Sequence, residues 1–423
     1  GPSERLGIRA GDRILTIDTE NAAGVGFKNS DVMKRLRGKK GTKVTVTMGR
    51  RGEPAPLEFV ITRDKIPIFS VDAGYMATPT VGYIKVSRFS ATTMKEFREK
   101  MDELKAMGMQ DLILDLQGNG GGYLRTAIEM ADEFLGDRKL VVYTEGRTSP
   151  REDTYATKEG RFEKGKLVVL VDEGSASASE IVSGAIQDWD RGVIVGRRSF
   201  GKGLVQRPVM LPDGSAVRLT VSRYYTPSGR CIQKSYDHGV EAYRMEKGTR
   251  LANGELTSAD SIHPQDTVKF YTMNKRVVFG GGGIMPDVFV PIDTSQSSAY
   301  FGQLVRKGVL NTFALNYVDE HRDELLKRYS SVEHFRNAFV VGDVMVSALE
   351  AYAMKEGIEP DPEGMERSGG LINIRLKALV ARDLWNTAAY WQVINAENPV
   401  DRSFQRALEI LGDNTFQRLG MTR

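Results

Sequence analysis

The sequence predicts an α/β core, with a small β-rich module before it and an all-helical segment after it. The core is indicated by short, continuous apolar runs at residues 112–116 and 167–171, each followed by a helical pattern. In the last part of the chain, strand patterns give way to helical spacing. A chain of 423 residues is too long for one ordinary domain. We therefore expect three domains, at residues 1–66, 67–296 and 297–423.

The first module is expected to be β-rich because its apolar residues alternate with polar ones, as in half-buried strands. Its strands are expected at residues 13–17, 43–48 and 57–62, with a helix at residues 29–36. The core is expected to alternate strands with helices: strands at residues 81–86, 112–116, 167–171, 193–195, 204–209 and 216–225, and helices at 92–107, 124–135 and 179–188. The last segment shows helical patterns at residues 341–354, 372–384 and 404–411.

Composition argues against several kinds of partner and cofactor. The 59 basic and 55 acidic residues leave a net charge of +4, too small to predict a nucleic-acid partner. One cysteine, Cys231, cannot form an internal disulfide. The histidines, His238, His263, His321 and His334, do not have the spacing of metal ligands. We expect no metal and no cofactor.

The first of three strand-to-helix junctions in the core is residues 115–122, with the sequence DLQGNGGG. Glycines at such a junction let backbone N–H groups approach a ligand or a developing oxyanion closely. A dinucleotide-binding fingerprint would need a third glycine where Tyr123 stands, so the dinucleotide interpretation fails.

The second junction, residues 174–180, has the sequence GSASASE and leads into a helix. A serine here lies at a helix N-terminus, where unpaired N–H donors and the helix dipole favour negative charge. Ser177 and Glu180 also have the spacing of a capping box. From this segment alone a cap is the simpler role for Ser177, and the two roles are compatible.

The third junction, residues 196–203, has the sequence GRRSFGKG and imitates a phosphate-binding loop. Gly203 stands where that loop needs Ser or Thr, and a strand rather than a helix is expected after it, so we reject nucleotide binding. Lys202, between two glycines, is sterically free to face a pocket.

Serine chemistry at these junctions requires a base, and none of the four histidines lies in a junction. A lysine can replace histidine as base. A free lysine titrates near pH ~10.4, so a neutral amine at pH 7 costs about 4.6 kcal/mol unless apolar surroundings lower its pKa. Phe200 and Leu204 are suitable apolar neighbours of Lys202, and Gln206 is placed to accept a hydrogen bond from the amine.

Together with residues 223–227 (RYYTP) and 282–287 (GGIMPD), these junctions resemble the carboxyl-terminal processing peptidases, also called tail-specific proteases. The interval from Ser177 to Lys202 is 202 − 177 = 25 positions, which is the spacing of that family. Gln117 departs from the pattern, because the family usually has arginine there.

The resemblance implies a serine endopeptidase that acts without ATP at or near protein C-termini. Ser177 would be the nucleophile, Lys202 the general base and Gln206 the residue that holds the lysine. The oxyanion hole would be formed by the backbone N–H of Ala178 with that of Gly121 or Gly122. Three further positions would support the site: Glu180, Asp188 and Ser199.

The resemblance also implies a ClpP/crotonase-like core and, through residues 1–14 (GPSERLGIRAGDRI), a PDZ-like peptide-binding module at residues 1–66 whose first strand and carboxylate-binding loop are missing from the sequence. Helical extensions in relatives support homo-oligomers or adaptor docking. A periplasmic or other extracytoplasmic location is expected, with the export signal outside this sequence. The alternatives are a non-catalytic peptide-binding adaptor and, more remotely, a crotonase-like acyl-CoA enzyme.

Overall fold

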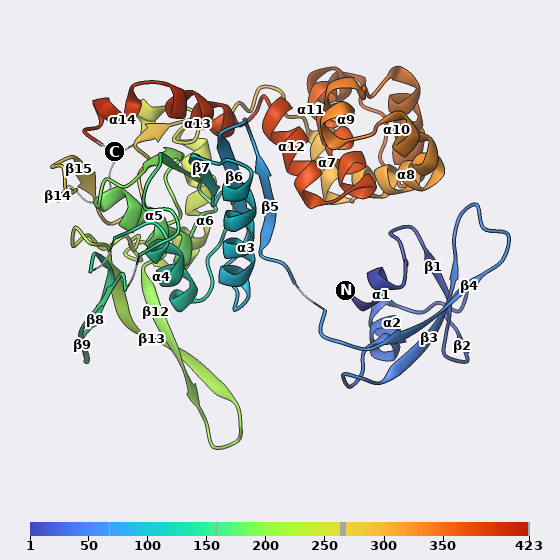
Figure 1. Cartoon of the computed structure of the whole chain (residues 1–423), viewed down its shortest axis with the longest axis horizontal. Coiled ribbons are helices and arrows are strands. Elements are labelled where there is room, and N and C mark those ends of the chain that lie inside the picture. Colours follow the sequence, from blue (N-terminus) through green and yellow to red (C-terminus); the bar gives the residue numbers. More distant parts are fainter. Residues whose placement is uncertain (67, 137, 158, 263–267, 422–423) are drawn as a thin grey trace. The chain divides into compact units, whose positions relative to one another are not determined.

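The computed structural model describes residues 1–66, 68–136, 138–157, 159–262 and 268–421, and the chain divides into two units (Figure 1). One unit combines Gly1–Ile68 with Ser295–Glu397. The other combines Phe69–Thr294 with Asn398–Arg423.

A six-stranded sheet forms the centre of the second unit, in the order β16-β11-β10-β7-β6-β5. Only β5 pairs antiparallel with its neighbour, and the other pairs are parallel. The strands are β5 (Val71–Met76), β6 (Val81–Val86), β7 (Asp111–Asp115), β10 (Leu167–Val171), β11 (Val193–Gly196) and β16 (Val288–Phe289).

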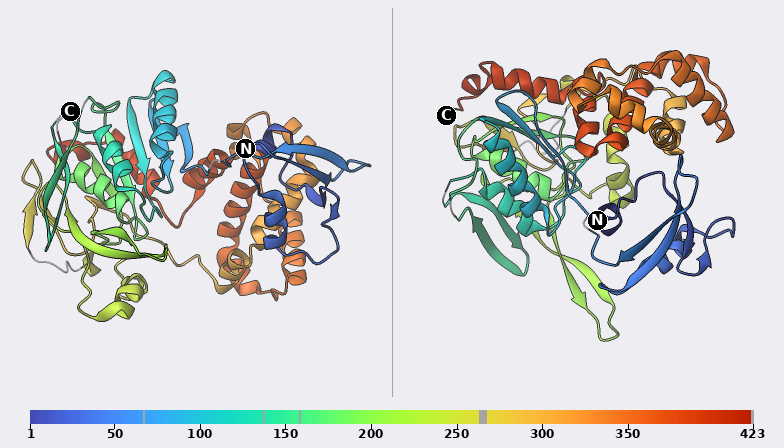
Figure 2. Two further views of the ribbon diagram at one scale, coloured as in Figure 1. Left: turned by 90° about the horizontal axis from the view of Figure 1, so that it is seen from below. Right: turned by 45° about the vertical axis from the view of Figure 1, so that its right-hand side comes forward.

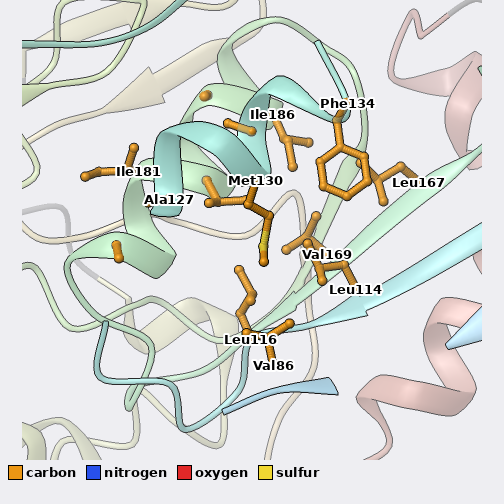
Figure 3. Close-up of a cluster of buried hydrophobic side chains, with 14 of the residues drawn as sticks. Val86, Leu114, Leu116, Ala127, Met130, Phe134, Leu167, Val169, Ile181 and Ile186 are labelled. Carbon is orange, nitrogen blue, oxygen red and sulfur yellow. The ribbon is translucent and has the colours of Figure 1, made fainter. Parts of the chain in front are cut away.

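Helices cover both faces of this sheet, which explains why its inner strands are continuous apolar runs. Side chains of α3 (Thr93–Ala106), α4 (Leu124–Asp132) and α5 (Ala178–Asp188) pack on one face, where Met130 and Ala127 lie over Leu114 and Val169 (Figure 3). The other face is covered by α13 (Ser403–Gly412), followed by α14 (Thr415–Arg418). There, the rings of Tyr83 and Phe404 meet edge to face at 5.4 Å.

A second, antiparallel sheet has the order β12-β13-β8-β9. Its strands are β8 (Leu140–Gly146), β9 (Ser149–Tyr155), β12 (Leu204–Met210) and β13 (Ala216–Tyr225). The hairpin of β12 and β13 extends from the core as a long two-stranded arm in both Figure 1 and Figure 2. The remaining elements of this unit are α6 (Gly239–Ala252), a short 3₁₀ helix (Ala259–Ser261), β14 (Lys269–Tyr271) and β15 (Val277–Phe279).

The first unit has two hydrophobic cores of its own. Residues Ile17, Val44, Val46, Met48 and Ile61 form the core of a four-stranded sheet in the order β2-β1-β3-β4. This part contains α1 (Pro2–Arg5), β1 (Arg13–Ile17), β2 (Glu20–Asn21), α2 (Asn29–Leu36), β3 (Lys43–Gly49) and β4 (Leu57–Thr62). The helical part has a separate core and contains α7 (Ala299–Arg306), α8 (Val309–Arg328), α9 (Val332–Ala338), α10 (Asp343–Lys355), α11 (Pro362–Leu384) and α12 (Thr387–Glu397).

The β-rich first module, the mixed α/β core and the largely helical last segment are as the sequence predicts. The expected boundaries after residues 66 and 296 lie within two residues of those of the two units. Three domains were expected, whereas the chain divides into two units: residues 1–68 group with the helical part, and Asn398–Arg423, expected in the helical domain, group with the core. Within the described ranges, no helix is both long and apolar enough to cross a membrane.

Candidate active site

The three predicted junctions meet at one edge of the central sheet. They follow β7, β10 and β11, which are adjacent and parallel. The carboxyl ends of neighbouring parallel strands lie side by side, and this edge is where α/β sheets bind ligands. Residues from all three junctions line one open pocket of about 590 Å³.

Ser177 lies at the N-terminus of α5 in a strained backbone conformation, with φ of 56° and ψ of −109°. A positive φ is rare for a residue other than glycine, and such strain often marks a functional position. The cap expected from the sequence is only partly present: Ser177 N–H donates to Glu180 Oε2 at 2.7 Å, but the Ser177 hydroxyl makes no capping hydrogen bond. The hydroxyl is therefore available for another role.

Gly121 brings the first junction against Ser177. Its φ is +99°, and a Cβ at this position would lie only 2.8 Å from Ser177 Cβ and 3.0 Å from Ala178 N. Only glycine fits such an approach. The Gly121 N–H is already engaged, since it donates to Asn119 Oδ1 at 2.9 Å.

The two remaining N–H groups predicted for the oxyanion hole, those of Gly122 and Ala178, are not used in hydrogen bonds between the described residues. Phe89 N–H donates to Gly121 O and Tyr123 N–H donates to Phe89 O, so the intervening N–H of Gly122 points away from Phe89. Ala178 is the first residue of α5, and helices leave this N–H unpaired. Of the two glycines that the sequence left open, the structure favours Gly122, because the N–H of Gly121 is used by Asn119.

Glu180 joins the second and third junctions. Its side chain is fully buried and accepts hydrogen bonds from the N–H groups of Ser177, Gly201 and Lys202 and from Ser199 Oγ, at 2.5–2.9 Å. Burial raises the pKa of the Glu180 carboxyl, and these donors act in the opposite direction. Glu180 and Ser199 therefore contact the loops that carry Ser177 and Lys202, and their supporting roles stay predictions.

Lys202 shares the pocket with Ser177, but its side chain is exposed. Among the described residues, Lys202 Nζ has no hydrogen bond or ion pair, with Ser177 or any other group. Leu204 lines the pocket as expected, whereas the Phe200 ring lies under Lys234 Nζ at 3.8 Å and does not. The apolar burial expected for the lysine is not present in this arrangement.

Gln206 also lines the pocket and is exposed, on β12 opposite Thr220. The described structure gives its amide no partner, so its role toward Lys202 stays a prediction. Asp188 is not brought to the pocket, because it lies at the opposite end of α5. There it accepts hydrogen bonds from Arg230 and from Ser228 N–H.

Two residues that hold the site together were given no role by the sequence. Tyr224 is buried, and its hydroxyl donates to the carbonyl oxygens of Ser177, at 3.0 Å, and Lys202. Asn119 binds the second junction as well, because its carbonyl oxygen accepts from Ala176 N–H and from Ser179 Oγ. Both residues lie in motifs that carry the family resemblance, and this was the feature of the sequence that could have pointed to them.

The departure at Gln117 is accommodated locally. Its side-chain amide donates to Asp401 Oδ2 at 3.1 Å, and the same oxygen accepts from Arg197 at 2.9 Å. Asp401 therefore contacts residues of the first and third junctions. His263 lies outside the described residues, and none of the three described histidines lines the pocket. Within the same ranges, no cluster of His, Cys, Asp and Glu could hold a metal ion.

Comparison with known proteins assigns the middle of the chain to a family. Residues 80–242, which contain all three junctions, match the model of peptidase family S41. Residues 80–242 belong to peptidase family S41. A separate match, over residues 300–386, is to a family of unknown function, DUF8443.

Several curated proteins similar to this chain are named as carboxyl-terminal processing proteases. One from Synechocystis sp. is 35% identical over 64% of this chain and 62% of its own length. CtpB of Bacillus subtilis is 35% identical over 73% of this chain and 62% of its own. The chain thus spans less than two thirds of either relative. A solved structure of a photosystem II D1 C-terminal processing protease is 35% identical, covers 55% of this chain and 63% of its own, and has a TM-score of 0.36.

Proposed function

We propose that this chain is a serine endopeptidase in which Ser177 is the nucleophile and Lys202 the general base. The observation that carries the proposal is the setting of Ser177: a strained serine at a helix N-terminus, with a hydroxyl outside the cap, in a pocket shared with Lys202. The S41 match over the same residues supports it.

In the proposed reaction, neutral Lys202 takes the hydroxyl proton as Ser177 Oγ attacks a peptide carbonyl. The N–H groups of Ala178 and Gly122 stabilise the oxyanion, and one such donor is typically worth about 3–4 kcal/mol. Lys202 then returns the proton to the departing amine, which leaves an acyl-enzyme. Water, deprotonated by the same lysine, releases the acyl group and regenerates the serine.

Catalysis requires a change from the described arrangement, since Lys202 Nζ is exposed and not bonded to Ser177. The lysine side chain has to turn toward Ser177, or its loop has to shift. Gln206, in the same pocket, is the residue proposed to hold the amine once it has turned. Closure over a bound peptide would supply the desolvation that a neutral amine needs.

The substrates proposed are C-terminal regions of unfolded or loosely folded proteins, cleaved without ATP. The names of the similar proteases support this substrate class. We further propose that the module at residues 1–66 is PDZ-like and captures peptides, that the helical part forms homo-oligomers or docks an adaptor, and that the core is of the ClpP/crotonase type. The proposed location is periplasmic or otherwise extracytoplasmic.

Cleavage of an unfolded substrate protein tests the proposal, with products identified by mass spectrometry. Ser177→Ala and Lys202→Ala should each abolish cleavage while leaving thermal unfolding unchanged, because Ser177→Ala keeps the Cβ and the Lys202 side chain is exposed. Lys164→Ala, at an exposed lysine of the same unit, is the control and should cleave normally. Normal turnover by either site variant would end the proposal.

A peptide-binding protein without activity is the second candidate, favoured by the exposed and unpartnered Lys202. That candidate predicts binding of unfolded substrate with no cleavage, and no labelling of Ser177 by a fluorophosphonate. Labelling of the wild type but not of Ser177→Ala would exclude it.

A further inference from the structure

Helix α6 (Gly239–Ala252) is attached to the core in an unusual way. Surface helices are ordinarily held by an apolar stripe. In α6 the buried residue is a charged one, Arg250, which is only 3% exposed. A buried guanidinium is costly unless its donors are paired, so the contacts of Arg250 show what the helix is attached to.

Arg250 donates to three consecutive carbonyl groups of the loop that leads to Lys202. Its Nη1 lies 3.2 Å from Arg198 O and 2.8 Å from Ser199 O, and its Nη2 lies 3.4 Å from Phe200 O. The third nitrogen of the guanidinium, Nε, donates to Glu246 Oε1 at 2.6 Å, and Glu246 lies one turn earlier on α6. One side chain therefore fixes the backbone path of residues 198–200.

Ion pairs and a cation–π contact also fix the side chains of this loop. Arg198 donates to both carboxylate oxygens of Glu255, at 2.5 and 2.7 Å. Glu246 also accepts from Lys234 Nζ at 3.0 Å, and Lys234 in turn covers the Phe200 ring. Loop residues 198 and 200, four and two positions before Lys202, are thus fixed by both backbone and side chain.

We propose that Arg250 is a positioning residue for the general base. Its guanidinium sets the course of residues 198–200 and with it the place from which the Lys202 side chain can reach Ser177. Glu180 fixes the same loop from the opposite side, through Ser199, Gly201 and Lys202. The inference rests on the proposed function of Ser177 and Lys202, and extends it to a helix that contributes no residue to the pocket.

The test compares Arg250→Met with Arg244→Met, the same substitution at an exposed arginine of α6. Peptide cleavage gives kcat and KM, and fluorophosphonate labelling of Ser177 is followed at a series of pH values. A displaced base slows acylation by about 10- to 100-fold. Arg250→Met should therefore lower kcat by that factor with KM changed little, and move half-maximal labelling to higher pH. Arg250→Lys should recover part of the loss, and Arg244→Met should match the wild type.

Thermal unfolding of each variant distinguishes an effect on the position of Lys202 from a general loss of stability. If Arg250→Met does not fold, Arg250→Lys and Glu246→Gln carry the test, since each weakens the same contacts and retains side-chain volume. Folded variants with wild-type kcat and an unmoved pH midpoint would overturn the inference. Failure of the proposed function would give a different result: the wild type would not be labelled, or Ser177→Ala would still cleave. In either case the inference about Arg250 would also be wrong.

Discussion

The backbone N–H groups of Ser177 and Lys202 donate to the same oxygen atom, Glu180 Oε2, at 2.7 and 2.9 Å. The two residues are 25 positions apart in sequence and lie on different junctions, yet one buried carboxylate holds both main chains. The distance between nucleophile and base thus depends on a residue that does not line the pocket.

Replacing Glu180 by Gln should impair both folding and activity. The amide NH₂ would face donors where the carboxylate accepts, and each buried donor left unpaired costs about 1–3 kcal/mol. We expect a lower Tm and at least a tenfold loss of kcat, measured by thermal unfolding and peptide cleavage. Glu241→Gln, at an exposed position of α6, should change neither quantity. An unchanged Glu180→Gln variant would mean that the carboxylate does not hold the two junctions.

Tyr224→Phe removes the hydroxyl that bridges the carbonyls of Ser177 and Lys202. A single hydrogen bond typically contributes about 1 kcal/mol. We expect the free energy of unfolding, measured with a chemical denaturant, to fall by that amount. We also expect a fall in kcat that exceeds any change in KM. Tyr225→Phe is the matched control, because the neighbouring ring stacks on Tyr143 without needing its hydroxyl. Equal effects of the two variants would contradict a role for Tyr224 in joining the junctions.

The strands and the three junctions could be predicted because they depend on local patterns. The expected strands at residues 167–171 and 216–225 are confirmed to the residue, since continuous apolar or alternating runs set them. The hydroxyl of Tyr224 and the guanidinium of Arg250 could not be assigned, because their partners lie 22 to 52 positions away. The exposure of Lys202 was unforeseen for a related reason: flanking apolar residues need not pack around their neighbour, and Phe200 packs on Lys234 instead.

Stability should depend on pH through Asp401. Burial raises the pKa of this carboxyl, but Arg197 and the hydrogen bonds from Ser403 together outweigh burial and hold the pKa below its ordinary value. A lowered pKa contributes stability that is complete above the unfolded value, near pH ~3.9, and is lost as the pH falls through the folded value. The difference in unfolding free energy between wild type and Asp401→Asn should therefore be constant near neutral pH and shrink below about pH 4. Urea unfolding at a series of pH values measures it, and a difference independent of pH would contradict the ion pair.

Substitution by alanine should impair the site at Gly121 but not at the adjacent Gly120. Gly121→Ala places a Cβ 2.8 Å from Ser177 Cβ and from Ala176 O, at a φ of +99° that alanine rarely adopts. The serine must move, so we expect labelling of Ser177 by a fluorophosphonate to fall about 100-fold or more, with a lower Tm.

Gly120→Ala is the matched control, because a Cβ there meets nothing within 4 Å and the backbone is not in the left-handed region. It should fold and react as the wild type does. If both variants reacted alike, the close approach of Gly121 to Ser177 would not be what shapes the site. If Gly121→Ala kept its Tm but lost labelling, the contact would act on the nucleophile alone, because the strain would then be relieved by Ser177 and not by the fold.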